Sequence, residues 1–425
     1  MMDAAKTENI PDLMARIGED AKAAAALLAM ATTESKNKVL MEAASSLRRR
    51  KNKVLSENAK DMAAAKDKGL SAAMLDRLEL TDERLENVAG ALEQVAELPD
   101  PVGTILEERE RPNGLIIRRV CVPLGVIGVI YESRPNVTAD AGSLCLKAGN
   151  AAILRGGSES FYSSCAIMES LADGLRAAGL PAAAIQLVPT TDRAAVGEML
   201  GMVDIIDVII PRGGKSLVER VTADSKVPLF KHLEGNCHSY VHADADADMA
   251  RKIVVNAKMR RTGICGATET LLIDRDAVGA MLGPIVDDLS DAGCEIRGDT
   301  DAQAADARIV PATDEDWDTE YLESIISVKV VDGVDDAIGH IARHGSQHTD
   351  CIITGNTGAA NKFTNEVDSA IVLVNASTQF ADGGEFGMGA EIGISTGKLH
   401  ARGPVGVDQL TSSKYIVLGE GQIRP

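Results

Sequence analysis

Short apolar runs alternate with segments of helical periodicity through the middle of this 425-residue chain. The runs at 126–131 and 151–155 have the length of buried strands, and helical patterns follow them at 136–148 and 158–178. The same alternation continues with a strand at 185–188, a helix at 191–200, a strand at 205–210 and a helix at 215–223. Helices that connect successive strands make those strands parallel. The pattern therefore predicts a doubly wound α/β sheet whose ligand crevice lies at the carboxyl ends of the strands.

A second α/β series begins after Cys265. It predicts strands at 268–273, 326–331, 351–354 and 371–375, and helices at 276–289, 335–343 and 358–367. A chain of this length is expected to form two or three domains. We therefore interpret the second series as a separate, smaller α/β domain.

The first hundred residues are rich in alanine, with helices predicted at 11–29, 33–66 and 81–97 as a partly solvated arm. Two charged, strand-like runs follow at 104–111 and 115–123, joined by Asn113-Gly114. Asn-Gly between two such runs is a strong hairpin signal. We expect either a hairpin that protrudes toward another subunit or domain, or an ordinary surface hairpin.

Charge and cysteine content exclude several classes of protein. The net charge of −19 argues against non-specific nucleic-acid binding and against docking on anionic membranes. The longest apolar runs are shorter than the about 20 residues of a membrane-spanning helix. Seven scattered cysteines without a Cys-x-x-Cys pair predict reduced thiols in a cytoplasmic protein rather than a disulfide framework.

One cysteine stands in a setting that favours nucleophilic chemistry. Cys265 follows Lys258, Arg260 and Arg261 and is flanked by glycines, just before a strand-like run. Nearby positive charge or free backbone N–H groups lower the pKa of a thiol, and glycines let a substrate approach the backbone. The alternative is a buried structural cysteine, the commoner fate of an intracellular thiol.

Two glycine turns that follow predicted strands could bind phosphate through helix N-termini, although the chain has no Gly-x-Gly-x-x-Gly motif after a strand. The first turn contains Arg155, Gly157 and Ser158, and the second contains Gly213 and Gly214. An arginine at the end of a strand suits the 2′-phosphate of NADPH, because its planar guanidinium binds phosphate with two hydrogen bonds. An ordinary β–α turn is the alternative for each.

Two metal-like patterns are better explained without a metal. His340, His344 and His348 are spaced by four with Cys351 nearby, but Gly345 interrupts the helix, so we expect a solvated helix end. The aspartates at 244, 246 and 248 lack the glycine and glutamate of a calcium loop, and we expect them to cap a helix that starts near Asp248. No metal site is predicted.

Several long stretches resemble the aldehyde dehydrogenase superfamily, and within it the gamma-glutamyl phosphate reductase family. They are 122–136, 147–158, 230–238, 256–272, 383–391 and 398–404, and the resemblance extends over essentially the whole chain. It implies NADPH-dependent reduction of L-glutamate 5-phosphate to L-glutamate 5-semialdehyde, with release of phosphate, in proline biosynthesis. It also implies a homo-oligomer, with functional coupling to glutamate 5-kinase as a further possibility.

The resemblance further implies a domain division. A cofactor-binding domain would span 1–232, with a helical arm at 1–98 and an oligomerisation hairpin at 102–122. A catalytic domain would span 233–398, and a segment at 399–425 would return to the cofactor domain, with 415–418 as a companion strand of the hairpin.

Roles for single residues are implied by the same resemblance. Cys265 would form a thioester, and Asn136 would help to hold the oxyanion. Glu234 lies near the position of a general base in hydrolytic relatives, but here it stands in Leu-Glu-Gly-Asn, which fits an enzyme that does not activate water. Thr262 and Gly266 depart from the residues expected beside the thiol. The cofactor candidates are Lys147, Arg155, Gly157, Ser158, Gly213, Gly214 and Glu320, and the substrate candidates are Arg260, Lys398, His400 and Arg402.

Two other functions stay open at this point. A hydrolytic aldehyde dehydrogenase would use the same cysteine without needing phosphate. A catalytically silent scaffold with the same fold would not need a reactive thiol at Cys265.

Overall fold

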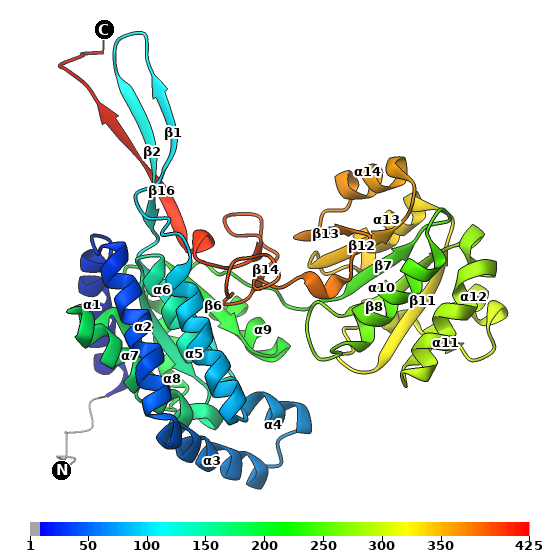
Figure 1. The fold of residues 1–425 in the computed structure, drawn as a ribbon, viewed down its shortest axis with the longest axis horizontal. Helices are drawn as coiled ribbons and strands as arrows, with labels where there is room; N and C mark the ends of the chain where they lie inside the picture. The colour runs from blue at the N-terminus through cyan, green and yellow to red at the C-terminus, as the bar shows by residue number, and fades with distance from the viewer. Residues whose placement is uncertain (1–8, 425) are drawn as a thin grey trace. The chain divides into compact units, whose positions relative to one another are not determined.

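The computed structural model describes residues 9–424, and its contacts divide the chain into two compact units (Figure 1). Unit 1 comprises Met1–Lys231, Gly387–Gly393 and Val405–Pro425, and unit 2 comprises His232–Phe386 and Ile394–Pro404. Compared with the boundaries expected from the sequence, segment 387–393 falls in unit 1 and segment 399–404 falls in unit 2. Among the described residues, no helix is both long enough and apolar enough to cross a membrane.

A parallel sheet lies at the centre of unit 1, and its described strands follow the order β5-β4-β3-β6. Every residue of the two central strands β3 and β4 is buried, as expected for apolar runs covered on both faces. The strand order reverses between β3 and β6, and this confirms the predicted doubly wound topology. The strands are β3 (Val126–Tyr131), β4 (Ala151–Gly156), β5 (Ile185–Leu187) and β6 (Val208–Arg212).

Helices connect these strands as the sequence predicted. α7 ends at Gly179, whose φ of 70° is the left-handed conformation that glycine adopts readily after a helix. α6 and α7 pack on the sheet and against each other, and α1 packs beside α8. The connecting helices are α6 (Val137–Lys147), α7 (Phe161–Ala178), α8 (Ala194–Gly201) and α9 (Lys215–Asp224).

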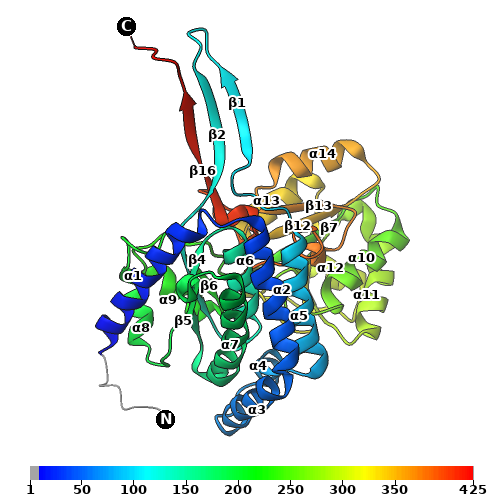
Figure 2. The ribbon, with the colours of Figure 1, turned by 60° about the vertical axis from the view of Figure 1, so that its left-hand side comes forward.

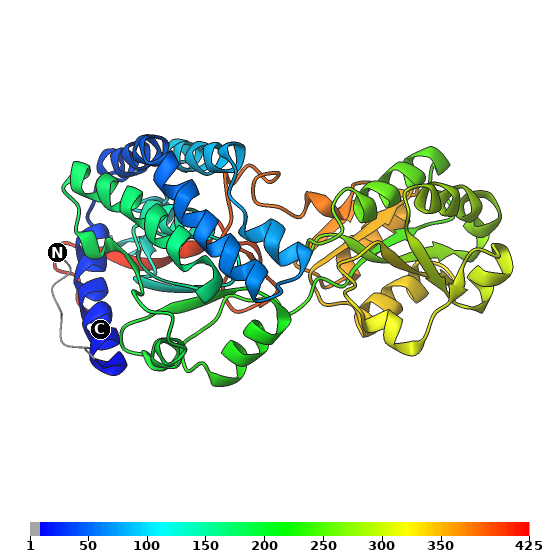
Figure 3. The same ribbon diagram turned by 90° about the horizontal axis from the view of Figure 1, so that it is seen from below.

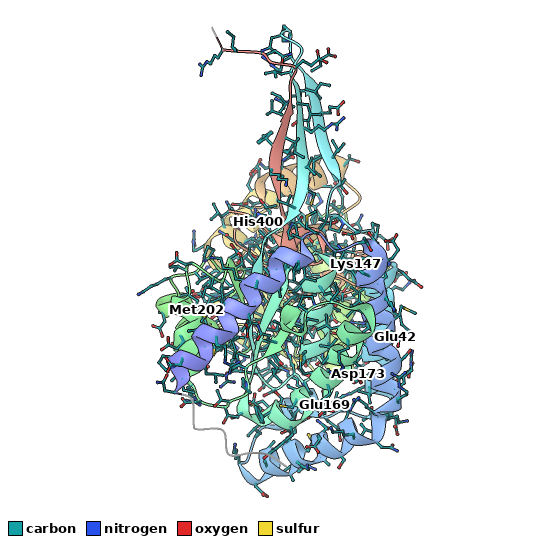
Figure 4. The ribbon with its side chains drawn as sticks, turned by 90° about the vertical axis from the view of Figure 1, so that its left-hand side faces the viewer. Glu42, Lys147, Glu169, Asp173, Met202 and His400 are labelled. Carbon is teal, nitrogen blue, oxygen red and sulfur yellow. The ribbon has the colours of Figure 1, made fainter. Side chains whose placement is uncertain are left out.

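The N-terminal helices belong to unit 1 and pack against its other elements, and many of their residues stay exposed, as expected for a partly solvated arm (Figure 3). The single helix predicted at 33–66 breaks at Arg50, whose guanidinium donates to Glu169 and Asp173 on α7 (Figure 4). A Cβ atom at Gly174 would lie 2.3 Å from the carbonyl oxygen of Val39, so α2 and α7 approach closely. The helices are α1 (Ile10–Leu28), α2 (Thr33–Arg49), α3 (Lys51–Asp67), α4 (Ala72–Leu78) and α5 (Asp82–Glu97).

An antiparallel ribbon extends from unit 1 (Figure 2). β1 (Ile105–Glu110) and β2 (Ile116–Pro123) form the hairpin predicted around Asn113-Gly114, and Gly114 has a φ of 84° in the turn. β16 (Thr411–Leu418) pairs with β2 along its whole length, which confirms the predicted companion strand. The ribbon order is β1-β2-β16, so both outer strands have an open edge in the described structure.

Unit 2 contains a second parallel sheet, whose described strands follow the order β10-β9-β11-β8-β7-β12-β13. The predicted strands near 268, 326, 351 and 371 are confirmed, whereas β7, β9 and β10 were not predicted. β7 was missed because its sequence, Cys-His-Ser-Tyr-Val, is polar, although every residue of the strand is buried. The strands are β7 (Cys237–Val241), β8 (Thr268–Asp274), β9 (Glu295–Gly298), β10 (Val310–Pro311), β11 (Ile325–Val331), β12 (Thr349–Ile353) and β13 (Ile371–Val374).

Two apolar clusters pack against the sheet of unit 2, and they contain different sets of helices. Residues of α10 and α11 belong to one cluster, and residues of α13 and α14 belong to the other. Asp246 caps α10 by accepting the N–H of Met249, which confirms the predicted capping role of this aspartate run. The helices are α10 (Ala247–Met259), α11 (Gly283–Asp291), α12 (Thr300–Ala305), α13 (Val334–His344) and α14 (Thr357–Glu366), and a short antiparallel pair joins β14 (Ile394–Ser395) to β15 (Gly403–Pro404).

Candidate active site

Cys265 lies in the loop between α10 and β8, half-buried against the apolar side chains of Ile371, Ala381 and Ile394. The loop before β7 lies directly against it. A Cβ atom at Gly235 would stand 2.1 Å from the carbonyl oxygen of Cys265, so only glycine allows this approach. The thiol is thus held in a loop that is packed on two sides but not sealed.

Two histidines from distant parts of unit 2 converge on this thiol. One ring nitrogen of His232, one ring nitrogen of His348 and the Cys265 sulfur all lie within 4.8 Å of one another. The two rings meet edge to face, with their centroids 5.0 Å apart. Nδ1 of His232 lies 2.7 Å from the carbonyl oxygen of Ile394, and Nδ1 of His348 lies 2.8 Å from Oγ1 of Thr349. These contacts fix both ring orientations.

The histidines favour the thiolate form of Cys265. Burial alone would raise the pKa of the Cys265 thiol, but attraction to His348 and a hydrogen bond from His232 hold the pKa well below the ordinary thiol value. The sequence predicted instead that Lys258, Arg260 and Arg261 supply the positive charge that lowers this pKa, and that prediction is wrong. Lys258 is fully buried in an ion pair with Glu269, and the exposed Arg260 donates to Gln379.

A second cysteine nearby has the opposite character. Burial raises the pKa of Cys237 well above the ordinary thiol value, and its thiol donates to the carbonyl oxygen of Cys265 at 3.0 Å. Cys237 therefore stays protonated and supports the loop, whereas the surroundings of Cys265 favour its thiolate form.

A strand-preceding loop brings Glu320 to the same place. Its Oε1 accepts the N–H of Gly235 at 2.9 Å, and burial raises the pKa of its carboxyl. Two residues later, Leu322 has a φ of 56° and donates its N–H to Glu269 at 3.3 Å. The buried Lys258–Glu269 pair thus links α10, β8 and the Glu320 loop around Cys265.

The expectation of a solvated helix end at the clustered histidines is wrong. α13 ends at His344 before Gly345, as predicted, but His340 and His348 are buried. His340 packs between the rings of His238, His344 and Trp317, and His348 immediately precedes β12. Sequence reasoning missed His232 and His348 as site residues. Neither has a local sequence signal, because they meet only through the adjacency of β7 and β12 in the sheet.

The other predicted substrate residues lie in different settings. Lys398 and Arg402 both form ion pairs with Asp368, and Arg402 also donates to its carbonyl oxygen at 2.8 Å. His400 is exposed (Figure 4). Lys398 and Arg402 thus already share one carboxylate, which a substrate anion would have to replace.

The cofactor candidates of unit 1 lie at the carboxyl ends of its strands. Arg155, near the end of β4, is 5% exposed, and its guanidinium donates to carbonyl oxygens of Gly156 and Thr191. Its buried Nε has no hydrogen-bond partner among the described residues, and burial lowers the pKa of the guanidinium. A phosphate group would satisfy both the charge and the donor, so this position fits a phosphorylated dinucleotide.

At each of the two glycine turns a glutamate carboxylate lies against the glycine, and a phosphate would have to replace it. At the first, Glu159 folds over Gly157 and accepts from the backbone N–H of Ser133 at 2.6 Å, and Ser158 is exposed. At the second, Gly214 precedes α9 without a side-chain cap in the described structure, and its N–H points to Glu132 at 3.3 Å. Gly213 has room for no Cβ atom, because the Glu132 carboxylate would lie 2.6 Å away.

Lys147 and Asn136 lie elsewhere in unit 1. Lys147 is fully buried, and its ammonium donates to Asn37 at 2.6 Å and to the carbonyl oxygen of Ala96 at 2.8 Å. This placement gives Lys147 a role in helix packing and offers no support for cofactor contact. The Asn136 amide donates to Asp140 at 2.8 Å, at the start of α6, and burial raises the pKa of Asp140 to about 6.

Comparisons with known proteins agree with this geometry. The model of the aldehyde dehydrogenase family matches residues 6–304. A gamma-glutamyl phosphate reductase of Rhodospirillum rubrum is 64% identical over 427 residues, covering 100% of both chains. One from Paramagnetospirillum magneticum is 64% identical over 413 residues, covering 97% of this chain and 98% of that protein.

Solved structures agree as well. The crystal structure of gamma-glutamyl phosphate reductase from Thermotoga maritima has 42% sequence identity and a TM-score of 0.95, covering 97% of this chain and 100% of that chain. The enzyme from Saccharomyces cerevisiae has 31% identity and a TM-score of 0.54, covering 97% of this chain and 98% of that chain. With its thiolate site and its full-length relatives, the chain belongs to the gamma-glutamyl phosphate reductases of the aldehyde dehydrogenase family.

Proposed function

We propose that Cys265 is the nucleophile with which this enzyme reduces L-glutamate 5-phosphate to L-glutamate 5-semialdehyde in proline biosynthesis. The reaction uses NADPH and releases phosphate. The observation that carries the assignment of the nucleophile is the convergence of His232 and His348 on the Cys265 sulfur within 4.8 Å. Among the described cysteines with a shifted pKa, Cys265 alone has it lowered.

The chain's own residues account for the first half-reaction. The Cys265 thiolate attacks the carbonyl carbon of the acyl phosphate, a carbon–sulfur bond forms, and phosphate leaves with the electrons of the carbon–oxygen bond. Backbone N–H groups near Cys265 would stabilise the oxyanion, and Asn136 is a further candidate donor. One such donor is typically worth about 3 kcal/mol.

The second half-reaction needs a hydride. When bound, NADPH supplies the hydride that converts the thioester to a thiohemiacetal. The electron pair of the hydride forms the new carbon–hydrogen bond, and the carbonyl π electrons move to the oxygen. When the oxyanion forms the carbonyl again, the carbon–sulfur bond breaks, its electrons return to Cys265 as the thiolate, and the aldehyde is released. His232 and His348 stabilise the returning thiolate, which makes it a better leaving group.

Water must stay away from the thioester for this sequence to be productive. Glu320 accepts a hydrogen bond from Gly235, so its carboxylate is tied to the loop beside the thiol. We assign Glu320 to the nicotinamide-side ribose. Arg155, Gly157, Ser158, Gly213 and Gly214 would bind the remainder of the cofactor, with Arg155 on the 2′-phosphate.

Arg260, Lys398, His400 and Arg402 are our candidates for the phosphate and α-carboxylate of the substrate. Arg260 follows α10 in the loop that leads to Cys265, which favours it for the leaving phosphate. Lys398 and Arg402 already bind one carboxylate together, that of Asp368. The α-carboxylate of the substrate could replace Asp368 between these two side chains.

The ribbon of β1, β2 and β16 supports assembly into a homo-oligomer. It exposes Ile105, Leu106, Tyr415, Val417 and Leu418, and both of its edges are open in the described structure. We place the enzyme in the cytoplasm, where reduced thiols persist and glutamate 5-kinase could supply its unstable acyl phosphate directly.

Phosphate dependence tests the proposed reaction. The enzyme is incubated with NADP⁺ and L-glutamate 5-semialdehyde, and NADPH formation is followed with and without inorganic phosphate. We expect formation only with phosphate, because phosphate must resolve the thioester in the reverse direction. Equal rates without phosphate would show a hydrolytic aldehyde dehydrogenase and overturn the proposal.

A further inference from the structure

The thiol and its two histidines also have the composition of a metal-binding site. A thiolate and two imidazoles are ligands that Zn²⁺ prefers, and three protein ligands leave a fourth position for water. In a tetrahedral site of this kind, the ligand atoms lie roughly 3.4 to 3.6 Å apart. The three atoms here lie within 4.8 Å of one another, so small side-chain rotations would bring them to that spacing.

The hydrogen bonds behind the ligands favour metal binding. Metal-ligating histidines usually bind an oxygen through their other ring nitrogen, which fixes the ring and its tautomer. The carbonyl oxygen of Ile394 accepts from Nδ1 of His232 at 2.7 Å, and Oγ1 of Thr349 lies 2.8 Å from Nδ1 of His348. With Nδ1 of each ring held in this way, Nε2 is the nitrogen that each ring would offer to a metal.

His348 provides an independent observation. Its side chain is 0% exposed, and its Nε2 has no hydrogen-bond partner among the described residues. A buried polar nitrogen without a partner costs free energy, and a bound cation would satisfy it. His348 is held in place by the start of β12, so it cannot turn to solvent without disturbing the sheet.

We propose that His232, Cys265 and His348 form a reversible inhibitory site for Zn²⁺ or a similar divalent transition metal. Metal bound there occupies the lone pair of the nucleophile and blocks acylation. Acylation of Cys265 in turn removes the thiolate ligand, so substrate turnover and metal binding exclude each other. No bond of the protein is broken, and a chelator reverses the inhibition.

The test measures metal binding without substrate or NADPH, so it is independent of the reaction proposed above. The full-length enzyme is titrated with Co²⁺ and then with Zn²⁺ against a chromophoric chelator. We expect one site per chain, with a thiolate-to-cobalt charge-transfer absorption and the ligand-field bands of a tetrahedral ion. A titration without the charge-transfer absorption would overturn the proposal.

Variants distinguish metal binding at this site from metal binding to acidic side chains on the protein surface. Cys265→Ser should lose the charge-transfer absorption and the one-to-one Zn²⁺ binding. Thr349→Val removes only the hydrogen bond behind His348 and should weaken Zn²⁺ binding about 10- to 100-fold. His344→Gln, a histidine whose partner is Asp318, is the matched control and should bind Zn²⁺ normally. Unchanged binding in Cys265→Ser would overturn the inference.

Activity provides the final readout. Zn²⁺ should inhibit the wild-type enzyme, a chelator should restore full activity, and prior incubation with the semialdehyde should protect. If the enzyme is active but binds no metal at this site, only this inference fails. If Cys265→Ser remains active, the proposed function fails instead.

Discussion

The two units have similar parallel sheets but carry their candidate functional residues at opposite edges. In unit 1, Arg155 lies at the carboxyl end of β4, and Gly157 and Gly213 directly follow β4 and β6. In unit 2, Cys265, His348 and Gly235 lie just before the amino ends of β8, β12 and β7, which are neighbours in the sheet. The usual rule for open α/β sheets places ligands at the carboxyl ends, so it agrees with the candidate residues of unit 1 but not with those of unit 2.

This difference has a chemical consequence. A thiol at a helix N-terminus can be ionised by the helix dipole, but Cys265 follows the C-terminal end of α10. Its stabilisation must come from side chains, and His232 and His348 supply it. All seven histidines of the chain lie in unit 2 and none in unit 1, so the two units should also respond differently to acid.

The largest expected effect is at the proposed nucleophile of unit 2. Cys265→Ser should lower kcat by at least about 10³-fold, because a serine hydroxyl is not ionised by the same imidazoles. Binding of NADPH, measured by fluorescence titration, should be retained. Cys165→Ser, at the half-buried cysteine of α7 in unit 1, is the control. A Cys265→Ser enzyme with near wild-type turnover would refute the nucleophile.

The next effect contrasts the buried lysines of the two units. Lys258→Met leaves Glu269 buried without its partner, and we expect the free energy of unfolding to fall by about 3–5 kcal/mol in urea. Lys147→Met removes the donor to the neutral oxygens of Asn37 and Ala96, while the nearby Asp100 keeps its ion pair with Lys36, so the loss should be about 1–3 kcal/mol.

A double variant sharpens this contrast. Lys258→Met with Glu269→Leu replaces the ion pair by apolar side chains and should recover most of the stability lost in Lys258→Met. Equal losses in the single and double variants would show that the pair contributes by packing alone.

His348→Gln tests the source of the thiolate. With an ordinary thiol pKa of about 8.5, only a few per cent of Cys265 would be ionised at pH 7, so alkylation by iodoacetamide should slow roughly 30-fold. The wild-type rate should stay high as the pH falls below 7, because its pKa is lowered. His344→Gln should alkylate like the wild type, and an unchanged pH profile in His348→Gln would exclude this histidine.

Arg155→Ala tests the carboxyl edge of unit 1. The value of kcat/KM for NADPH should fall about tenfold, while that for NADH should stay within twofold or so, because only NADPH carries the 2′-phosphate. Arg176→Ala, an exposed arginine on α7, is the control. Equal losses with both cofactors would move the 2′-phosphate site away from Arg155.

The smallest effect concerns acid stability. Burial lowers the pKa of His340 to about 2, so its ring stays neutral in the folded protein while the unfolded chain binds a proton below about 6.5. Because of this histidine, the free energy of unfolding should fall by about 1.4 kcal/mol for each unit by which the pH is lowered below 6.5. In urea unfolding between pH 5 and 7, His340→Gln should show a shallower slope. An identical slope would contradict the burial effect.

Much of the fold could be predicted from the sequence. The apolar runs of β3 and β4, and the Asn-Gly turn of the hairpin, carry strong local signals, and Cys265 stood out by its surroundings. The helix break at Arg50 could not be predicted from the sequence, because no glycine or proline marks it. Its cause is a tertiary contact with Asp173. β7 was hidden by its polar sequence.

The activating histidines could not be predicted for a related reason. His232 and His348 meet only because β7, β8 and β12 are adjacent in the sheet, and strand order has no local signal. The same holds for Lys147 and Lys258. Lys147 was predicted to bind the cofactor and Lys258 to supply charge near the thiol, yet both are fully buried.

The glycine beneath the nucleophile also constrains the gene. Every amino-acid replacement at codon 235 adds a Cβ atom, and that atom would stand 2.1 Å from the carbonyl oxygen of Cys265. Even alanine, the mildest missense change, must displace the loop that carries the thiol. In a saturation library selected for growth without proline, codon 235 should therefore tolerate synonymous changes only, although its residue takes no part in the chemistry.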